Sequence, residues 1–147
     1  MKEILELGNG SPLGADTLGW VVNDRLEEAL KGCHEDSMRI ELRKADRPGL
    51  ALIEMLRPWP HAILVDAVVS GAPAGTLHHL AGDELPRSPA RLSTHDAGVA
   101  EAIALGSAMN ALPPVLELFG VEVVPDNPAD TEAVGDLAER ITRHLGC

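Results

Sequence analysis

Aromatic side chains and cysteines are scarce in this chain. It has no tyrosine, and Trp20, Trp59 and Phe119 are its whole aromatic set. The core must therefore be built from alanine, valine, leucine and isoleucine, which is usual for proteins that alternate strands and helices. The two cysteines are Cys33 and Cys147, the last residue, so the sequence indicates no disulfide framework.

Basic residues are also few. Lysine and arginine number 12 against 23 acidic residues, which gives a net charge of −11 and a pI near 4.8. This balance argues against binding to nucleic acid or to anionic membranes, both of which require basic patches. No apolar run approaches the roughly 18 residues of a membrane-spanning helix. Residues 1–8 carry acids where a signal peptide needs a basic and then an apolar stretch, so we predict a cytoplasmic protein.

Short apolar runs alternate with longer segments of helical period along the 147 residues. The pattern predicts strands at 4–8, 38–43, 62–65, 76–80 and 115–123, and helices at 16–31, 49–56, 95–109 and 130–145. This order indicates one α/β domain with helices on both faces of a mostly parallel sheet. Ligands of such sheets bind beyond the carboxyl ends of the strands, so the functional residues are to be sought there.

Three residues fall at this edge of the predicted sheet. Asp66 follows the apolar run 62–65, where an unpaired charge costs several kcal/mol, so it either binds a ligand or caps the next loop. Asp16 begins the first helix after the glycine loop 8–14, and it either caps that helix or binds a ligand. His95 begins another helix, whose dipole disfavours the imidazolium form; it is either a ligand or an exposed residue near a cap.

Taken together, Asp16, Asp66 and His95 suit a divalent first-row metal ion and leave open coordination positions.

The sequence disfavours other kinds of binding or catalytic site. The glycine loop 8–14 has neither the dinucleotide spacing nor the basic residue of a phosphate loop, and no His-Glu-x-x-His or Gly-x-Ser-x-Gly motif occurs. The adjacent His78 and His79 would point to opposite faces of a strand. The other histidines, His34, His61 and His144, are predicted in turns or the tail.

Three ordered motifs, in residues 8–19, 61–68 and 93–99, resemble those of the hydrogenase maturation endopeptidases. That family has a G-N-x-L-x-x-D-D-G-x-G segment, an apolar strand ending in D-A, a P-G turn and an S-x-H helix start. The family's P-G turn corresponds here to Pro73, Ala74 and Gly75. Residues 113–121 resemble a strand that lies late in the sequences of the family. The resemblance covers nearly the whole chain. It implies a single domain over 1–147, a three-layer α/β/α sandwich with a mostly parallel sheet of about five strands.

The resemblance also implies a function. Members of the family remove a C-terminal extension from the large subunit of nickel–iron hydrogenases after nickel insertion. Carried over, Asp16, Asp66 and His95 are the catalytic and nickel-sensing residues of an aspartic-type endopeptidase that activates the hydrogenase. The partner is the precursor large subunit, and the nickel belongs to it, so no cofactor of the protein's own is expected. The alternatives are a non-catalytic nickel-dependent chaperone or checkpoint, and a small-ligand or nucleotide-binding domain.

The sequence departs from the family pattern in two places. Ala15 replaces the first acid of the D-D pair and Thr17 replaces the usual glycine. An alternative alignment puts Thr17 at the ligand position, but with Asp16 as the ligand residues 11–19 align without a gap. The family's D-G-G-T/S-x-G stretch corresponds to 44–49, where Gly49 is retained, so altered substrate choice or altered activity is expected.

Overall fold

The computed structural model describes residues 2–12, 17–33, 37–82, 84–87, 97–124, 127 and 130–147. The strands are β1 (Lys2–Gly10), β2 (Met38–Asp46), β3 (His61–Val68), β4 (Leu77–Ala81) and β5 (Val115–Glu122). The helices are α1 (Leu18–Leu30), α2 (Ala51–Leu56), α3 (Glu84–Arg87), α4 (Ala97–Ala108) and α5 (Thr131–His144). The short helix α3 is the one element that the sequence pattern did not predict.

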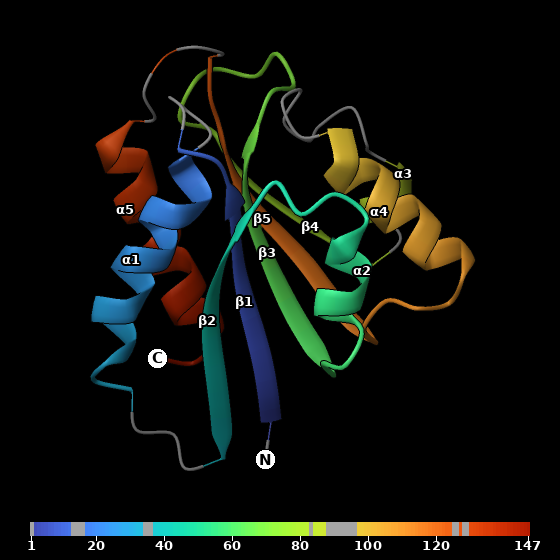
Figure 1. Ribbon diagram of the computed structural model, residues 1–147. Helices are drawn as coiled ribbons and strands as arrows, with labels where there is room; N and C mark the ends of the chain where they lie inside the picture. The colour runs from blue at the N-terminus through green and yellow to red at the C-terminus, as the bar shows by residue number, and fades with distance from the viewer. Residues whose placement is uncertain are drawn as a thin grey trace.

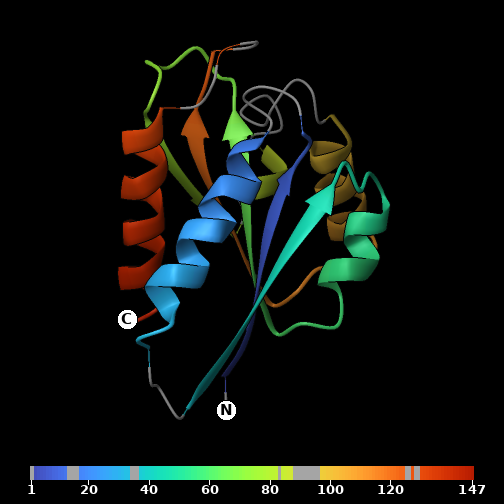
Figure 2. The same ribbon diagram turned by 60° about the vertical axis from the view of Figure 1, so that its left-hand side comes forward.

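The five strands form one sheet in the order β2-β1-β3-β5-β4. Four strands are parallel, and the edge strand β4 is antiparallel to β5. Helices α1 and α5 cover one face of the sheet, and α2, α3 and α4 cover the other (Figure 1). Figure 2 shows α1 and α5 side by side on their face, where they contact each other. The predicted three-layer α/β/α sandwich is therefore confirmed.

The central strand β3 supplies side chains to both cores. Ile63 and Val65 pack with α1 and α5, whereas Ala62 and Leu64 pack with α2 and α4. This double burial is why residues 62–65 form an unbroken apolar run rather than an alternating one.

None of the helices in the described part of the chain has the length and apolar character of a membrane span. The cytoplasmic location stays a prediction.

The first turn of α1 lies directly on the carboxyl ends of β1 and β3. A Cβ atom on Gly8 would lie 2.3 Å from the backbone oxygen of Gly19. A Cβ atom on Gly19 would lie 2.1 Å from the oxygen of Asn9 and 2.7 Å from that of Val65. Strand β1 also extends to Gly10, two residues beyond the predicted end. The first glycines of the predicted loop thus belong to the strand, and Gly8 allows close helix packing.

Cys33 and Cys147 form a disulfide, with their Cα atoms 5.5 Å apart. The sequence indicated no disulfide framework, so this bond was not predicted. They are 114 residues apart in sequence, and they meet because α1 and α5 pack side by side and end near each other. Sequence spacing carries no information about such an encounter.

Candidate functional site

Asp66 lies where the carboxyl-end rule places a ligand-binding residue. It is buried, with 3% of its surface exposed, and its Oδ1 accepts a hydrogen bond of 2.8 Å from the backbone N–H of Ala67. Strand alternation turns its side chain to the face covered by α2 and α4. It sits inside β3 rather than beyond it, because pairing with β5 continues to Val68.

Two further polar side chains are buried at the same edge. Asn9 and Ser11 are each 1% exposed, and they lie at and just after the end of β1. The last paired positions of β1 and β3 are Gly8 and Val65, so Asn9 and Asp66 are the next positions on neighbouring strands. Buried polar groups concentrated at a sheet edge are typical of a binding site rather than of a core.

Gly120 lies beside Asp66 on the other neighbouring strand, β5. A Cβ atom there would lie 2.5 Å from Cγ2 of Val68 and 2.9 Å from the backbone oxygen of Asp66. Any side chain at this position would therefore displace the strand that carries the carboxylate. Gly120 is therefore required for the close packing of β5 beside Asp66. The sequence pattern placed it in a strand without assigning it a role, although a glycine inside an otherwise apolar strand is a signal of such close packing.

Asp16 and His95, the other two predicted ligands, lie outside the described residues. The described residues nearest to them in sequence are Thr17, the N-cap of α1, and Ala97, the first residue of α4. Both helices begin at the edge of the sheet where the parallel strands end (Figure 1). The structure thus locates Asp66, whereas the three-residue site stays a prediction.

Glu122, at the end of β5, holds the loop after β3. Its carboxylate accepts hydrogen bonds from the backbone N–H and the hydroxyl of Ser70, and pairs with Nε2 of His78 at 3.0 Å. Burial raises the pKa of Glu122, but these hydrogen bonds and the charge of His78 outweigh burial and lower it. In a hydrolytic triad the serine hydroxyl donates to the imidazole. Here both donate to one carboxylate, so this group is not a serine-protease site.

A second polar cluster lies at the opposite end of the sheet, around Glu117 of β5. Its Oε1 contacts Nε2 of His79 at 2.9 Å and Nε2 of His144 at 2.8 Å, and its Oε2 contacts Nε2 of His61 at 2.7 Å. Burial raises the pKa of Glu117, but the hydrogen bonds of His61 and His79 and the charge of His144 lower it overall.

This cluster was not predicted from the sequence. His78 and His79 face opposite sides of the sheet, as predicted, and contact Glu122 and Glu117. His61 was predicted in a turn or the tail, and this is wrong, because it is the first residue of β3. The available signal was Glu117 itself, because a carboxylate within an apolar strand requires partners. Those partners come from three distant segments, and only the fold brings them together.

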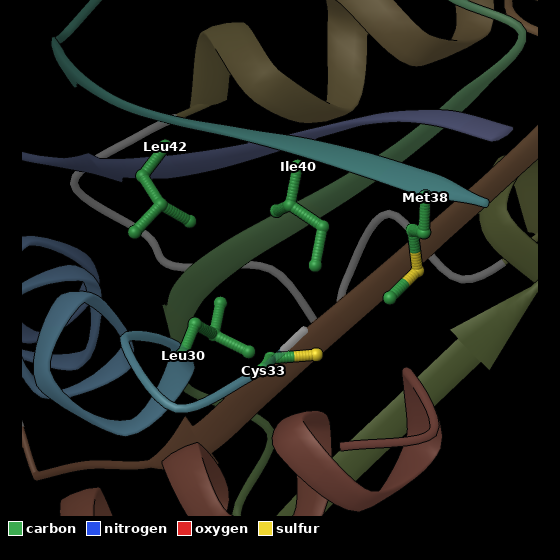
Figure 3. A pocket seen from close by; sticks show the side chains of 5 residues that line it. All are labelled: Leu30, Cys33, Met38, Ile40 and Leu42. Carbon is green, nitrogen blue, oxygen red and sulfur yellow. The ribbon is translucent and has the colours of Figure 1, made fainter. Parts of the chain in front are cut away.

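A pocket of about 160 Å³ lies beside the edge strand β2. Figure 3 shows the side chains of Leu30, Cys33, Met38, Ile40 and Leu42 around it. The Cys33 sulfur is held in the disulfide, and the other four side chains are hydrocarbon or thioether. With no titratable group among these residues, the pocket is not a candidate for the catalytic centre.

Comparison with known proteins identifies the family. Residues 25–145 match the family model described as hydrogenase maturation protease. The hydrogenase expression/formation protein HupD of Thiocapsa roseopersicina is 33% identical over 95% of this chain and 63% of its own length. HupM of Azotobacter chroococcum is 33% identical over 97% of this chain and 66% of its own length. The chain thus spans just under two thirds of these relatives.

Solved structures agree with the sequence comparison. The solution structure of an endopeptidase from Escherichia coli superposes with a TM-score of 0.73 at 26% identity, covering 99% of this chain and 90% of that one. Because the family model matches most of the chain, residues 25–145, the chain belongs to the hydrogenase maturation protease family.

Proposed function

We propose that the protein is an endopeptidase that removes the C-terminal extension of a nickel–iron hydrogenase large subunit after nickel insertion. The substrate's nickel ion is the recognition element, bound by Asp16, Asp66 and His95. The protein then needs no resident cofactor. Family membership supports the class of reaction, and the buried carboxylate of Asp66 supports the position of the site.

The proposal rests on the burial and the fixed orientation of the Asp66 carboxylate. A carboxylate 3% exposed near the carboxyl end of a central parallel strand is unfavourable unless a cation or hydrogen bonds compensate for its burial. One of its oxygens accepts the N–H of Ala67, which fixes the orientation of the carboxylate. A carboxylate fixed in this way is preorganised to bind a cation, because little freedom is lost on binding.

Binding of the substrate's nickel would position the scissile peptide at the edge where α1 and α4 begin. Hydrolysis adds the oxygen of water to the carbonyl carbon, breaks the C–N bond and transfers a proton to the leaving amine. The ion can polarise the carbonyl or the water, and a carboxylate or His95 can accept the proton from water. Requiring the ion for binding would make processing conditional on nickel insertion.

The test is the mass of a nickel-loaded large-subunit precursor before and after incubation with the protein. We expect loss of a C-terminal peptide with the wild type, and at least a roughly 100-fold slower loss with Asp66→Asn, Asp16→Asn or His95→Gln. Asp136→Asn changes an exposed aspartate on α5 and should process at the normal rate. Omission of nickel from the precursor should prevent cleavage.

Two outcomes would overturn the proposal. One is full-rate processing by Asp66→Asn with a folded protein. The other is a wild type that binds the nickel-loaded precursor without shortening it, which would identify a checkpoint protein instead of a protease.

A further inference from the structure

We propose that His79, Glu117 and His144 form a binding site for a divalent transition-metal ion of the Zn²⁺ type, with His61 orienting the carboxylate. This site is independent of the proposed protease function. It lies towards the other end of the sheet from the Asp66 site. Gly120, the partner of Asp66, is three residues beyond Glu117, or about 10 Å along the strand. The side chains of Asp66 and Glu117 also point to opposite faces of the sheet.

The ligand atoms already converge. One ring nitrogen of His79, one of His144 and one oxygen of Glu117 all lie within 4.8 Å of one another. Among the described residues this is the one group of three potential ligands that lie so close together. In a tetrahedral zinc site, metal–ligand distances of about 2.0–2.2 Å place neighbouring ligand atoms roughly 3.3–3.5 Å apart. To reach this spacing the contacts of 2.8 and 2.9 Å to Oε1 would open by about half an ångström, and the two imidazole nitrogens already lie within 4.8 Å of each other.

The chemistry of the set favours a borderline transition ion. Two imidazoles and a carboxylate are the protein ligands of several zinc enzymes, which keep a water molecule in the fourth position. Calcium and magnesium ions prefer oxygen ligands, so a site with two nitrogen ligands would bind them weakly. His144 lies in the last turn of α5, and the negative end of the helix dipole further favours a cation.

The surroundings hold the ligands in place, as metal sites require. His61 contacts the second oxygen of Glu117 at 2.7 Å, which leaves Oε1 directed at the other two histidines. The ring of Phe119 stacks on His79 with centroids 4.1 Å apart and meets His144 edge-on at 5.4 Å. Glu117 has a side chain only 8% exposed, whereas that of His144 is 39% exposed, so the ion has a path from solvent.

A bound ion would join three elements that are otherwise linked here by hydrogen bonds: the edge strand β4, the beginning of β5 and the end of α5. Each Nε2 must give up its proton or pass it to Nδ1 before it can coordinate the ion. Binding therefore competes with protons and should weaken as the pH falls.

The test uses Zn²⁺ alone and the full chain with Asp16→Asn, Asp66→Asn and His95→Gln, which removes the predicted ligands at the other end of the sheet. Isothermal titration calorimetry should give one bound Zn²⁺ in this parent. Adding Glu117→Gln or His144→Gln should weaken binding at least about 100-fold. The matched control is His78→Gln, the neighbouring histidine that faces Glu122 instead, and it should leave the affinity within twofold.

His61 is tested as a positioning residue. His61→Gln retains a hydrogen-bond donor and should weaken Zn²⁺ binding less than His61→Leu, for which a loss of roughly 10- to 100-fold is expected. Cobalt absorption gives a second measurement for each variant, because four-coordinate Co²⁺ absorbs far more strongly than the hydrated ion. Circular dichroism without metal confirms that each variant is folded.

Three results would overturn the site. The parent could bind no Zn²⁺, Glu117→Gln or His144→Gln could titrate like the parent, or His78→Gln could weaken binding as much as they do. In the first case the cluster is a set of hydrogen bonds that satisfies a buried carboxylate and nothing more.

Discussion

The two ends of the sheet stabilise a buried carboxylate by different kinds of contact. At the carboxyl end, Asp66 accepts a hydrogen bond from the adjacent backbone, and glycines bring the backbone of α1 and β5 close to it. At the amino end, Glu117 is surrounded by three histidine side chains that arrive from β3, β4 and α5. The first arrangement depends on close backbone packing, whereas the second depends on side chains.

This difference decides which substitutions each end tolerates. Backbone packing leaves no room for added atoms, so the carboxyl end should be sensitive to small increases in side-chain size. Side-chain contacts can be altered one at a time, so the amino end should lose metal affinity while the fold survives.

The largest effect is expected from Gly19→Ala. The added Cβ would lie 2.1 Å from the oxygen of Asn9, and the clash is with backbone, which cannot rotate away. We expect the free energy of unfolding to fall by roughly 3–5 kcal/mol in chemical denaturation, with loss of processing. Gly135→Ala is the matched control, since it is also helical and meets Arg25 only at 3.8 Å. It should stabilise by up to about 1 kcal/mol, and equal losses in both variants would contradict the packing argument.

A smaller effect, centred on the amino end, is expected when the Cys33–Cys147 disulfide is reduced. The bond closes a sequence separation of 114 residues, so its loss should lower the free energy of unfolding by about 2–4 kcal/mol. Cys147 follows His144 by three residues, so Zn²⁺ affinity should also fall while processing persists. The double variant Cys33→Ser, Cys147→Ser should reproduce the loss and should not respond to reductant. An unchanged melting temperature on reduction would show that the bond does not stabilise the fold.

The last effect concerns Glu6, between the two ends of the sheet; it is spread over several pH units, so each single pH step changes the stability least. Burial raises the pKa of Glu6 from its ordinary value of 4.5 to about 8, although a hydrogen bond from Asn23 and the charge of Lys44 lower it in part. Between these values the folded protein holds a proton that the unfolded chain releases. Its stability should therefore fall as the pH rises, by about 1.4 kcal/mol per pH unit from this group.

Glu6→Gln should remove that contribution to the slope, measured as the free energy of unfolding at pH 5, 6, 7 and 8. Glu27→Gln, on the exposed side of α1, should keep the wild-type slope. A wild-type slope in Glu6→Gln would show that Glu6 is ionised in the folded state.

Periodicity and strand-end chemistry were enough to predict the layers, the strand character of residues 62–65 and the placement of Asp66 towards the carboxyl end of its strand, although β3 continues two residues beyond it. These features are local, because an unbroken apolar run and the acid that follows it are neighbours in sequence. The helix α3, the disulfide and the cluster at Glu117 were not predicted. The last two depend on contacts between segments far apart in sequence, such as the pair His61 and Glu117, which are 56 residues apart.

The edge strand β4 carries His78 and His79 in succession, one bound to Glu122 and the other to Glu117. A slip of one residue against β5 would turn each histidine to the wrong face and leave two buried carboxylates without these partners at once. Edge strands are otherwise free to slide or to pair with other chains. The two histidines therefore disfavour a one-residue slip of this five-residue edge strand.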